Sequence, residues 1–500
     1  MKPQSWIKRS VKIWRRWVMG SEWKVIQLNQ FVKHQKGFAF KSKDYVSSGI
    51  PVVRVSNFTD DSVDISDFKY VSSDIADEKI AFELVENDVV IATVGSWPKN
   101  PASVVGKVIR VPITATPSLL NQNAVVLRPI SGEKYDKDFL FYLLKNNDFS
   151  NYIISTAQGS ANQASITLKD IYAYSFPLPN PEERKVLSNI LRKLDNKITL
   201  NRQINQTLEQ MAQTLFKSWF VDFDPVIDNA LDVGFFEQDL AFSDELLHRV
   251  EVRKAVRESD NFKPLSEDIR RLFPDAFEEC AEPALGLGGW VPKRWQISTV
   301  DDELTVKGGS TPSTANPDFW EQGNIHWTSP KDLSGSQEKI MLDTERKITE
   351  LGLRKITSGL LPINTVLMSS RAPIGYLAMA KIPVAINQGY IAITTTKRLS
   401  QEYVLYWLDS SMDEIKGIAG GTTFAEISKK TFKSISMVIP DPQVIEKYTV
   451  IIKSYLNKVT LNAKERGSLE KLRDTLLPKL ISGELSLSDI KIDIPEETLI

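Results

Sequence analysis

The sequence repeats itself at a fixed spacing. From Tyr142 onward, adding 261 to a residue number finds the same or a similar residue over a long ungapped stretch that starts at Tyr403. The strongest match joins residues 196–201 to residues 457–462, which read Asn-Lys-Ile-Thr-Leu-Asn and Asn-Lys-Val-Thr-Leu-Asn. A register of this length indicates a duplication. The 500 residues are therefore expected to form two related halves rather than one large core.

The match is weaker toward the start of each half. Asn121-Gln122 corresponds to Asn387-Gln388 at an offset of 266, and Trp23 corresponds to Trp295 at an offset of 272. These parts contain short β-branched stretches bounded by glycine, proline or asparagine, which predict strands. Each half is therefore expected to hold a mixed α/β domain followed by a helical part. Residues 226–289 have no counterpart and are interpreted as a connector.

Each helical part is predicted to be one long helix. Asn180-Pro181 supplies an N-cap and a proline at the first helical position, with Glu183 three residues after the cap, and Asp441-Pro442 repeats the cap and the proline. Behind each start, apolar residues recur at alternating steps of four and three, as in a coiled-coil seam. Both stripes turn polar at the same level, which favours helices packed on each other; the alternative is that each helix packs on its own domain. The predicted seam consists of Leu187, Leu191, Leu194, Ile198, Leu208, Leu215, Tyr448, Ile452, Val459, Leu469 and Leu476.

The charge is balanced overall but uneven along the chain. With 62 basic and 63 acidic residues, the net charge of −1 excludes an argument for nucleic-acid binding from overall basicity. However, no acidic residue occurs between Asp88 and Glu133, nor between Glu350 and Glu402, and the two gaps fall at equivalent places. A surface that faces phosphates is expected to exclude carboxylates. The alternative is a strand-rich core that lacks acidic residues, as strands often do.

Sequence readers are expected among the residues that differ between the halves. Asn and Gln can each bind adenine through two hydrogen bonds, but the Asn-Gln pairs are identical in both halves, which favours a role in the scaffold. The candidate DNA contacts are therefore polar, basic and aromatic residues in predicted loops. In the first half they are Lys33, His34, Lys36, Lys41, Arg54, Trp97 and Lys99, and in the second half Thr311, His326, Trp327, Lys331 and Arg371.

The sequence contains no recognisable catalytic motif. It has neither the glycine-rich loop ending in Gly-Lys-Ser/Thr that holds nucleotide phosphates nor a Gly-x-Ser-x-Gly motif. A single cysteine, Cys280, excludes an internal disulfide and a cysteine-rich zinc site, and three histidines argue against a histidine-bound metal centre. No apolar run approaches the ~18 residues of a membrane helix. We therefore expect a non-catalytic cytoplasmic protein without its own metal.

Several segments resemble the specificity subunit of type I restriction-modification enzymes. They are residues 49–54 (Gly-Ile-Pro-Val-Val-Arg), 211–225, 272–277 and 477–485, in addition to the two variable domains that each precede a matched helix. The resemblance implies an α+β fold in which two mixed α/β target-recognition domains, in a pseudo-twofold arrangement, are joined by two long antiparallel helices that form a coiled coil. The chain departs from the pattern in its long connector and in a basic extension at its start.

This resemblance divides the chain into seven segments. They are an N-terminal basic extension (1–22), target-recognition domain 1 (23–178), a central conserved helix (179–225), a connector (226–289), target-recognition domain 2 (290–440), a distal conserved helix (441–482) and a tail (483–500).

The resemblance also implies a function. Each domain would recognise one half of a bipartite site in double-stranded DNA, and the paired helices would set the distance between the halves. The helices would also bind two methyltransferase subunits, which methylate adenine N6 with S-adenosylmethionine. Restriction subunits that translocate and cleave DNA with ATP and Mg²⁺ would then join, so these cofactors would belong to the partners. The alternatives are a self-sufficient DNA methyltransferase or nuclease, and a coiled-coil adaptor without a DNA role.

Overall fold

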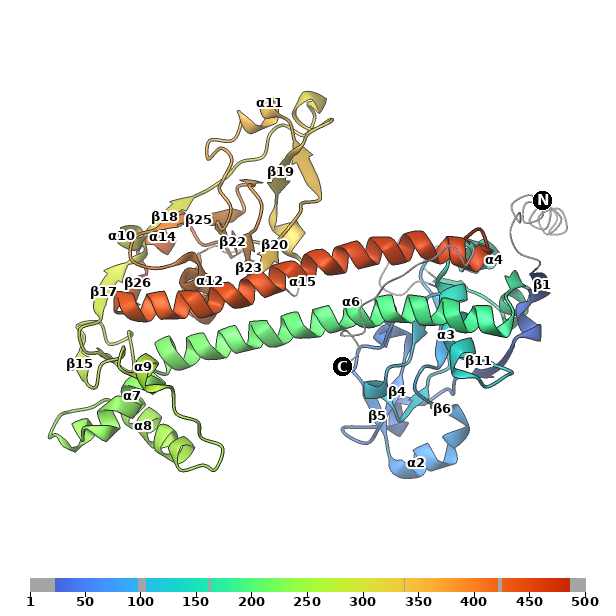
Figure 1. The fold of residues 1–500 in the computed structure, drawn as a ribbon, viewed down its shortest axis with the longest axis horizontal. Coiled ribbons are helices and arrows are strands. Elements are labelled where there is room, and N and C mark those ends of the chain that lie inside the picture. The colour runs from blue at the N-terminus through green and yellow to red at the C-terminus, as the bar shows by residue number, and fades with distance from the viewer. Residues whose placement is uncertain (1–22, 98–104, 161–162, 337, 421–424, 486–500) are drawn as a thin grey trace. The chain divides into compact units, whose positions relative to one another are not determined.

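The computed structural model describes residues 23–97, 105–160, 163–336, 338–420 and 425–485. The predicted N-terminal extension, Lys99 and most of the tail lie outside these residues. The chain divides into two compact units: the first contains residues up to 198 and from 467 onward, and the second contains residues 199–466. Two long helices, α6 (Pro181–Phe216) and α15 (Pro442–Ser482), each contribute to both units (Figure 1).

The first unit is built on a four-stranded antiparallel sheet with the order β2-β11-β7-β9. Its strands are β2 (Val32–Lys36), β7 (Val89–Ala92), β9 (Val108–Arg110) and β11 (Ala124–Pro129). All four residues of β7 are buried, because its two neighbouring strands and the helix α3 (Lys134–Lys145) surround it. The remaining helices of this domain are α2 (Ser73–Glu78), α4 (Asn147–Thr156) and α5 (Leu168–Tyr172).

Three further sheets complete the first unit. A five-stranded sheet has the order β3-β5-β4-β10-β6, a three-stranded sheet the order β12-β13-β8, and β1 pairs with β14. The bounds are β1 (Lys24–Gln27), β3 (Tyr45–Val46), β4 (Ile50–Val53), β5 (Lys69–Val71), β6 (Glu83–Leu84), β8 (Val94–Gly95), β10 (Ser118–Leu120), β12 (Gln158–Ser160), β13 (Gln163–Ser165) and β14 (Ser175–Leu178).

The second unit repeats this plan. Its main sheet has the order β18-β25-β22-β23-β20, a three-stranded sheet has the order β21-β19-β24, and β17 pairs with β26. The strands are β17 (Gln296–Thr299), β18 (Leu304–Lys307), β19 (Ile325–Thr328), β20 (Ile340–Met341), β21 (Arg346–Ile348), β22 (Val366–Ser370), β23 (Ile374–Ala380), β24 (Ala385–Ile386), β25 (Tyr390–Thr396) and β26 (Ser436–Ile439). The helices are α10 (Val300–Glu303), α11 (Glu350–Leu353), α12 (Gln401–Ser410), α13 (Met412–Gly417) and α14 (Lys429–Lys433).

The two domains therefore share one topology even where their sequences have diverged. The antiparallel trio β2-β11-β7 corresponds to β18-β25-β22. The parallel pair β4–β10 corresponds to β19–β24, and the pair β1–β14 corresponds to β17–β26. The helices α3, α4 and α5 correspond to α12, α13 and α14. The predicted duplication is confirmed, and these equivalences extend it into the divergent part of each domain.

Both long helices begin where the sequence predicts. Glu183 N donates to Asn180 Oδ1 and Asn180 N donates to Glu183 Oε2, each at 2.9 Å, which completes the predicted capping box. At the second helix, Gln443 N donates to Asp441 Oδ1 at 2.9 Å. Helix α6 ends in a π-helical turn, Lys217–Val221.

The two helices pack on each other within each unit, as predicted. In the second unit Asn462 Nδ2 donates to Asn205 Oδ1 at 2.9 Å, and Asn201 Nδ2 donates to Glu465 Oε2 at 2.8 Å. In the first unit Arg473 Nη1 donates to Asp195 Oδ1 at 3.1 Å. Residue numbers rise in one helix as they fall in the other, so the pairing is antiparallel. The polar breaks in the stripes contact each other, which fixes one register.

Residues 224–292 form a folded part of the second unit. They contain α7 (Asp224–Asp232), α8 (Asp244–Arg257), α9 (Glu267–Arg270), β15 (Phe277–Glu279) and β16 (Trp290–Pro292). Arg253 joins α8 to α7 through Asp228, at 2.6 Å between Nη2 and Oδ2. Phe235, Phe277 and Trp290 pack in one core with Trp219 and Tyr448 of the long helices. The segment interpreted as a connector thus covers the end of α6.

Candidate nucleic-acid interface

In the first unit, four segments meet at one edge of the main sheet. They are the end of β2, the residues before β11, the loop after β7 and the hairpin β12–β13. Gly37 N donates to Ala124 O at 3.1 Å, Thr93 N to Asn123 O at 2.9 Å, and Ile166 N to Thr93 O at 2.9 Å. We call this edge the polar edge of the first unit.

The second unit has the same edge. Ser310 N donates to Ile386 O at 3.1 Å, Ser370 N to Gly389 O at 2.8 Å, and Ile427 N to Ser370 O at 3.0 Å. These bonds join the end of β18, the residues before β25, the end of β22 and the segment before α14. This arrangement is the polar edge of the second unit.

A glycine is required at the same point of both edges. A Cβ atom on Gly37 would lie 1.9 Å from Asn121 O, and one on Gly309 would lie 1.8 Å from Ile386 O. Such approaches are far shorter than a van der Waals contact, so only glycine fits between the strand and the facing carbonyl. Neither glycine is among the residues predicted to form the site, although their matching offset of 272 is a signal in the sequence.

The asparagines of the Asn-Gln pairs are part of this scaffold. Asn121 N donates to Val53 O and Asn387 N donates to Thr328 O, both at 3.0 Å, and these bonds extend the parallel pairs β4–β10 and β19–β24 by one residue, just before the chain enters the main sheet of each domain. Gln122 and Gln388, in contrast, are exposed. The scaffold role that the sequence predicts therefore fits the asparagines and not the glutamines.

The exposed side chains of the two edges differ. The first edge carries amides and hydroxyls, which are Gln122, Asn123, Gln158, Ser160, Gln163 and Ser165. The second edge carries Thr311, whose Oγ1 donates to Gln388 Oε1 at 2.8 Å, and Arg371, which lies 3.7 Å from Glu426 (Nη1 to Oε1). Amide, hydroxyl and guanidinium groups are the side chains that recognise base edges in the major groove. The amides of the first edge are not among the predicted DNA contacts, because Gln158 and Gln163 reach this edge only through the pairing of β8, β12 and β13.

The candidates of the first half lie at different distances from its edge. Lys36 ends β2 at the edge, and Trp97 Nε1 donates to Ser160 O at 2.8 Å, so this side chain joins the loop after β7 to the hairpin. Arg54 follows β4, and its Nη2 lies 3.2 Å from Asp67 Oδ2. Lys33 is exposed on β2, and Lys41 is exposed before β3. His34 contacts the hydroxyl of Tyr172 through its Nδ1 atom.

The candidates of the second half include one residue of the core. Trp327 is only 5% exposed, packs against Trp320, and donates from Nε1 to Ser310 O. A side chain buried to this extent does not offer its ring to a base, which argues against the predicted contact of Trp327 with DNA. Lys331 is exposed and pairs with Glu345 at 3.0 Å, and His326 Nδ1 lies 3.2 Å from Thr344 Oγ1.

The two gaps in acidic residues consist largely of buried strands. Arg128 Nη2 binds the fully buried Asp88 at 2.5 Å, and Arg110 Nη1 binds Asp138 at 3.1 Å. Lys107 Nζ donates to Phe58 O, and in the second unit Arg398 binds the buried Glu303. Both gaps contain buried strands, as the alternative predicts, and these four cations have partners inside the domains, whereas Arg354, Lys355 and Lys397 of the second gap are exposed.

The predicted seam residues are occupied by contacts within the chain. Leu187 and Leu191 are fully buried with Leu480 in the core of the first unit. Tyr448 and Ile452 are fully buried in the core of the second unit, where Leu208 and Leu215 are partly buried. The helices therefore pack both on each other and on the domains. A partner has to use other residues of these helices.

Ion pairs fix each domain on the helices of its own unit. In the first unit Tyr142 donates to Asp195 of α6 at 2.7 Å, and Arg110 Nη2 lies 3.5 Å from the same carboxylate. Burial and the charge of Asp195 raise the pKa of Tyr142, so its hydroxyl remains a donor. In the second unit Lys339 lies between Glu209 of α6 and Asp409 of α12, at 2.7 and 2.9 Å.

The described residues contain no group of three or more His, Cys, Asp or Glu side chains that could hold a metal ion. Among the same residues, no helix is long and apolar enough to cross a membrane.

Comparison with known proteins gives a consistent result. Residues 20–210 and 292–471 match the family model described as the type I restriction modification DNA specificity domain. The HindI specificity subunit of Haemophilus influenzae is 29% identical over 366 residues, which cover 70% of this chain and 77% of that protein. The putative MjaX specificity subunit of Methanocaldococcus jannaschii is 22% identical and covers 93% of this chain and 94% of its own length.

A solved structure shows the same fold. The crystal structure of the S subunit of a type I restriction-modification system from M. genitalium aligns with a TM-score of 0.52 at 15% identity. The alignment covers 93% of this chain and 97% of that one.

Proposed function

Because this chain belongs to the family of type I restriction-modification DNA specificity subunits, which recognise DNA, we propose that each of its domains reads one half of a bipartite sequence through its polar edge. One observation carries the proposal: the two domains present different polar side chains on an identical scaffold. The shared scaffold contains Gly37 and Gly309, Asn121 and Asn387, and the same strand pairing. Two sites of this kind can each hold a different short sequence.

Single amide variants test which edge reads which half. We expect Gln163→Ala, in the hairpin of the first edge, to relax recognition at one position of one half-site. Gln388→Ala at the second edge should relax a position in the other half-site, because a lost bidentate contact costs about 1–3 kcal/mol of discrimination. The measurement is a genome-wide map of methylated adenines in cells that carry each variant.

Gln238→Ala is the matched control, because it removes an exposed amide that lies at neither edge. It should leave the map unchanged. If Gln163→Ala and Gln388→Ala altered the same half-site, the assignment of one half to each domain would be refuted.

The paired helices would set the spacing between the half-sites. Each unit contains one domain and a stretch of both helices, and contacts such as the ion pair of Arg110 with Asp195 attach the domain to them. A helix rises ~1.5 Å per residue, so the lengths of α6 and α15 are of the order of one or more turns of duplex DNA. The fixed antiparallel register of the pair supports this role.

The helices would also bind two methyltransferase subunits. Leu200 and Leu461 correspond at the offset of 261 and are 36% and 63% exposed, and Met211 and Leu472 correspond in the same way and are 46% and 44% exposed. In each helix the two residues are eleven positions apart, which is close to three full turns, so they share one face. An apolar stripe that occurs twice in equivalent form suits two copies of one partner.

The chemistry would belong to the partners. S-adenosylmethionine would be bound by the methyltransferase subunits, and ATP and Mg²⁺ by the restriction subunits. The absence of a nucleotide-binding loop and of any recognisable catalytic motif in the sequence supports a non-catalytic role for this chain.

A further inference from the structure

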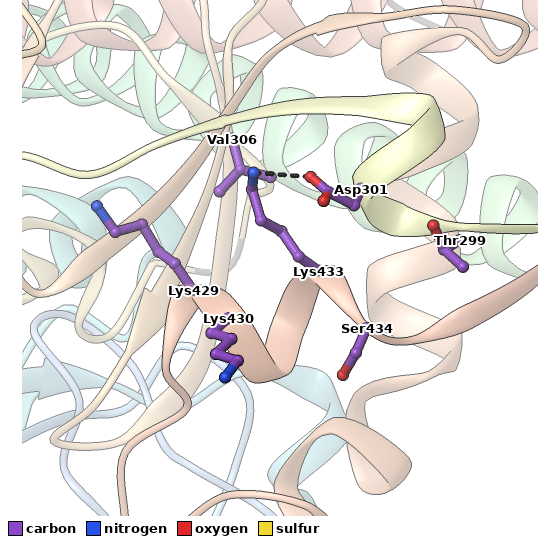
Figure 2. Close-up of a pocket in the computed structure, with 7 residues that line it drawn as sticks. All are labelled: Thr299, Asp301, Val306, Lys429, Lys430, Lys433 and Ser434. Atoms are coloured by element: carbon purple, nitrogen blue, oxygen red, sulfur yellow. Dashed lines mark ion pairs between the residues drawn. The ribbon is translucent and has the colours of Figure 1, made fainter.

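A hollow of about 660 Å³ lies beside the polar edge of the second unit. Three lysines of α14, Lys429, Lys430 and Lys433, line it together with Val306 of β18 and Asp301 of α10. Figure 2 shows the three ammonium groups at separate places around the hollow, with only Lys433 directed at Asp301. A single small ion would therefore not contact all three.

The local structure of α14 explains why its lysines face solvent. Ser428 Oγ accepts a hydrogen bond from Thr431 N at 3.0 Å and caps the turn, and the side chain of Phe432 is fully buried in the core. With Phe432 inside, Lys429 and Lys430 are left exposed. Lys433 Nζ binds Asp301 Oδ1 at 2.7 Å, whereas neither Lys429 nor Lys430 forms an ion pair with any residue in the described part of the chain.

The equivalent place in the first unit is built differently. Helix α5 has the same cap, Thr167, and the same buried anchor, Ile171. However, Leu168 and Tyr172, which are half-buried, stand where the second unit has Lys429 and Lys433, and Asp170 next to Lys169 lowers the net charge of the helix. The ring of Tyr172 lies 5.4 Å from that of His34, which is the counterpart of Val306. The first unit therefore keeps one exposed lysine at this place, Lys169, the counterpart of Lys430, and has Leu168 where the second unit has Lys429.

The lysines also lie next to the residues that form the polar edge. A Cβ atom on Gly308 would lie 2.9 Å from Lys429 Nζ, so this ammonium group rests against the end of β18. The chain then passes through Gly309 to Thr311, whose hydroxyl contacts Gln388. A strand of DNA that places its bases against Thr311 and Gln388 would carry its phosphates close to Lys429.

We propose that Lys429 and Lys430 bind successive phosphates of the DNA strand whose bases are read at the polar edge of the second unit. The inference rests on the proposed function and extends it by assigning backbone contacts. Separated, unpaired ammonium groups suit a run of phosphates, and each contact releases counterions. Lys433 contributes less, because Asp301 already neutralises it. The first unit has no equivalent pair of lysines. Binding of the half-site read by the second unit should therefore depend more strongly on salt concentration than binding of the other half-site.

The test is the salt dependence of binding to a labelled duplex that carries the mapped methylation site. The full-length chain in complex with its methyltransferase subunits is compared with the variant Lys429→Gln/Lys430→Gln. Each lost phosphate contact should reduce the slope of log Kd against log salt concentration by about 0.9. We expect the double variant to lose about twice this amount, while the methylated sequence remains the same.

Two further variants make the result specific. Lys429→Arg/Lys430→Arg should keep the wild-type slope, because it retains both charges. Lys254→Gln/Lys263→Gln removes two exposed charges elsewhere in the second unit and should also keep it. An unchanged slope in Lys429→Gln/Lys430→Gln would overturn the inference. A second result would also overturn the inference. If Lys429→Gln/Lys430→Gln kept the wild-type slope but bound the methyltransferase subunits more weakly when no DNA is present, the lysines would bind an acidic protein surface instead. If the wild-type complex showed no preference for its site, the proposed function itself would fail.

Discussion

At the scale of residues, Glu338 joins the second domain to both long helices. Its Oε2 accepts a hydrogen bond from Arg466 Nη2 at 3.0 Å, and its Oε1 accepts one from Asn205 Nδ2 at 2.8 Å. Burial alone would raise the pKa of this carboxyl, but the bonds from Arg466 and Asn205 outweigh burial and hold the pKa below its ordinary value. The folded state therefore keeps this charge at a pH where the unfolded chain is already protonated.

This linkage predicts how a variant depends on pH. A carboxyl with a lowered pKa stabilises the fold above its ordinary pKa of about 4.3, and the stabilisation is lost as pH falls through the lowered value. We expect Glu338→Gln to lower the free energy of unfolding by about 1–3 kcal/mol at neutral pH. The difference should shrink once the pH falls below the ordinary value. Thermal unfolding followed by circular dichroism across this range measures it.

Glu345→Gln serves as the control, because Glu345 is exposed and pairs only with the exposed Lys331 among the described residues. It should change stability little at any pH. A difference between Glu338→Gln and wild type that stayed constant with pH would show that the charge of Glu338 is not what stabilises the fold.

Single residues were also the hardest to predict from the sequence. The lack of acidic residues around Arg110 and Arg128 was correctly observed, but the carboxylates that bind them, Asp138 and Asp88, lie outside the gap or at its boundary. Trp327 is a candidate DNA contact because it is an aromatic residue that differs between the halves and is expected in a loop, yet it lies in β19, and Trp320 and the bond to Ser310 hold it in the core. In both cases the position of the side chain depends on residues that are not its neighbours in the sequence.

At the scale of elements, the two helices were predictable because their signals are local. The caps at Asn180 and Asp441 and the stripe behind each required no knowledge of the rest of the chain. The stripe does not indicate which apolar residues of the helices remain exposed and could bind another subunit. The seam is buried, and the exposed positions Leu200, Met211, Leu461 and Leu472 lie outside it.

These exposed positions give a prediction for assembly. Leu200→Asp/Met211→Asp places charges on the exposed stripe of α6, and we expect the chain to bind one methyltransferase subunit instead of two, because a carboxylate cannot be buried unpaired at low cost. Leu461→Asp/Leu472→Asp should also leave one, and all four changes together should leave none. Light scattering of the purified complexes gives the number bound.

Val450→Asp is the matched control on α15. Val450 is 63% exposed, but its counterpart at the offset of 261 is the polar Asn189, so it is not part of a repeated stripe. It should retain two subunits. If Leu200→Asp/Met211→Asp bound two subunits with wild-type affinity, the docking surface would have to lie elsewhere on the chain.

At the scale of the whole molecule, the duplication accounts for the two domains and for the two long helices. The offset between the halves predicted two related domains, and the strand orders show that they share one fold. The sequence could not predict the polar edges, because these are assembled from segments such as Gly37, Asn121 and Gln163 that meet only through strand pairing. The repeated glycines and asparagines maintain the edge, and the residues between them are free to differ.

The most direct test of the account is to exchange residues 23–178 for the corresponding domain of a relative with a different target and to map methylated adenines in the host genome. If each domain reads one half-site and the helices set the spacing, one half of the methylated sequence should become that of the relative. The other half, and the number of base pairs between the two, should remain as in the wild type. A map in which both halves changed, or in which the spacing changed while α6 and α15 were intact, would contradict it.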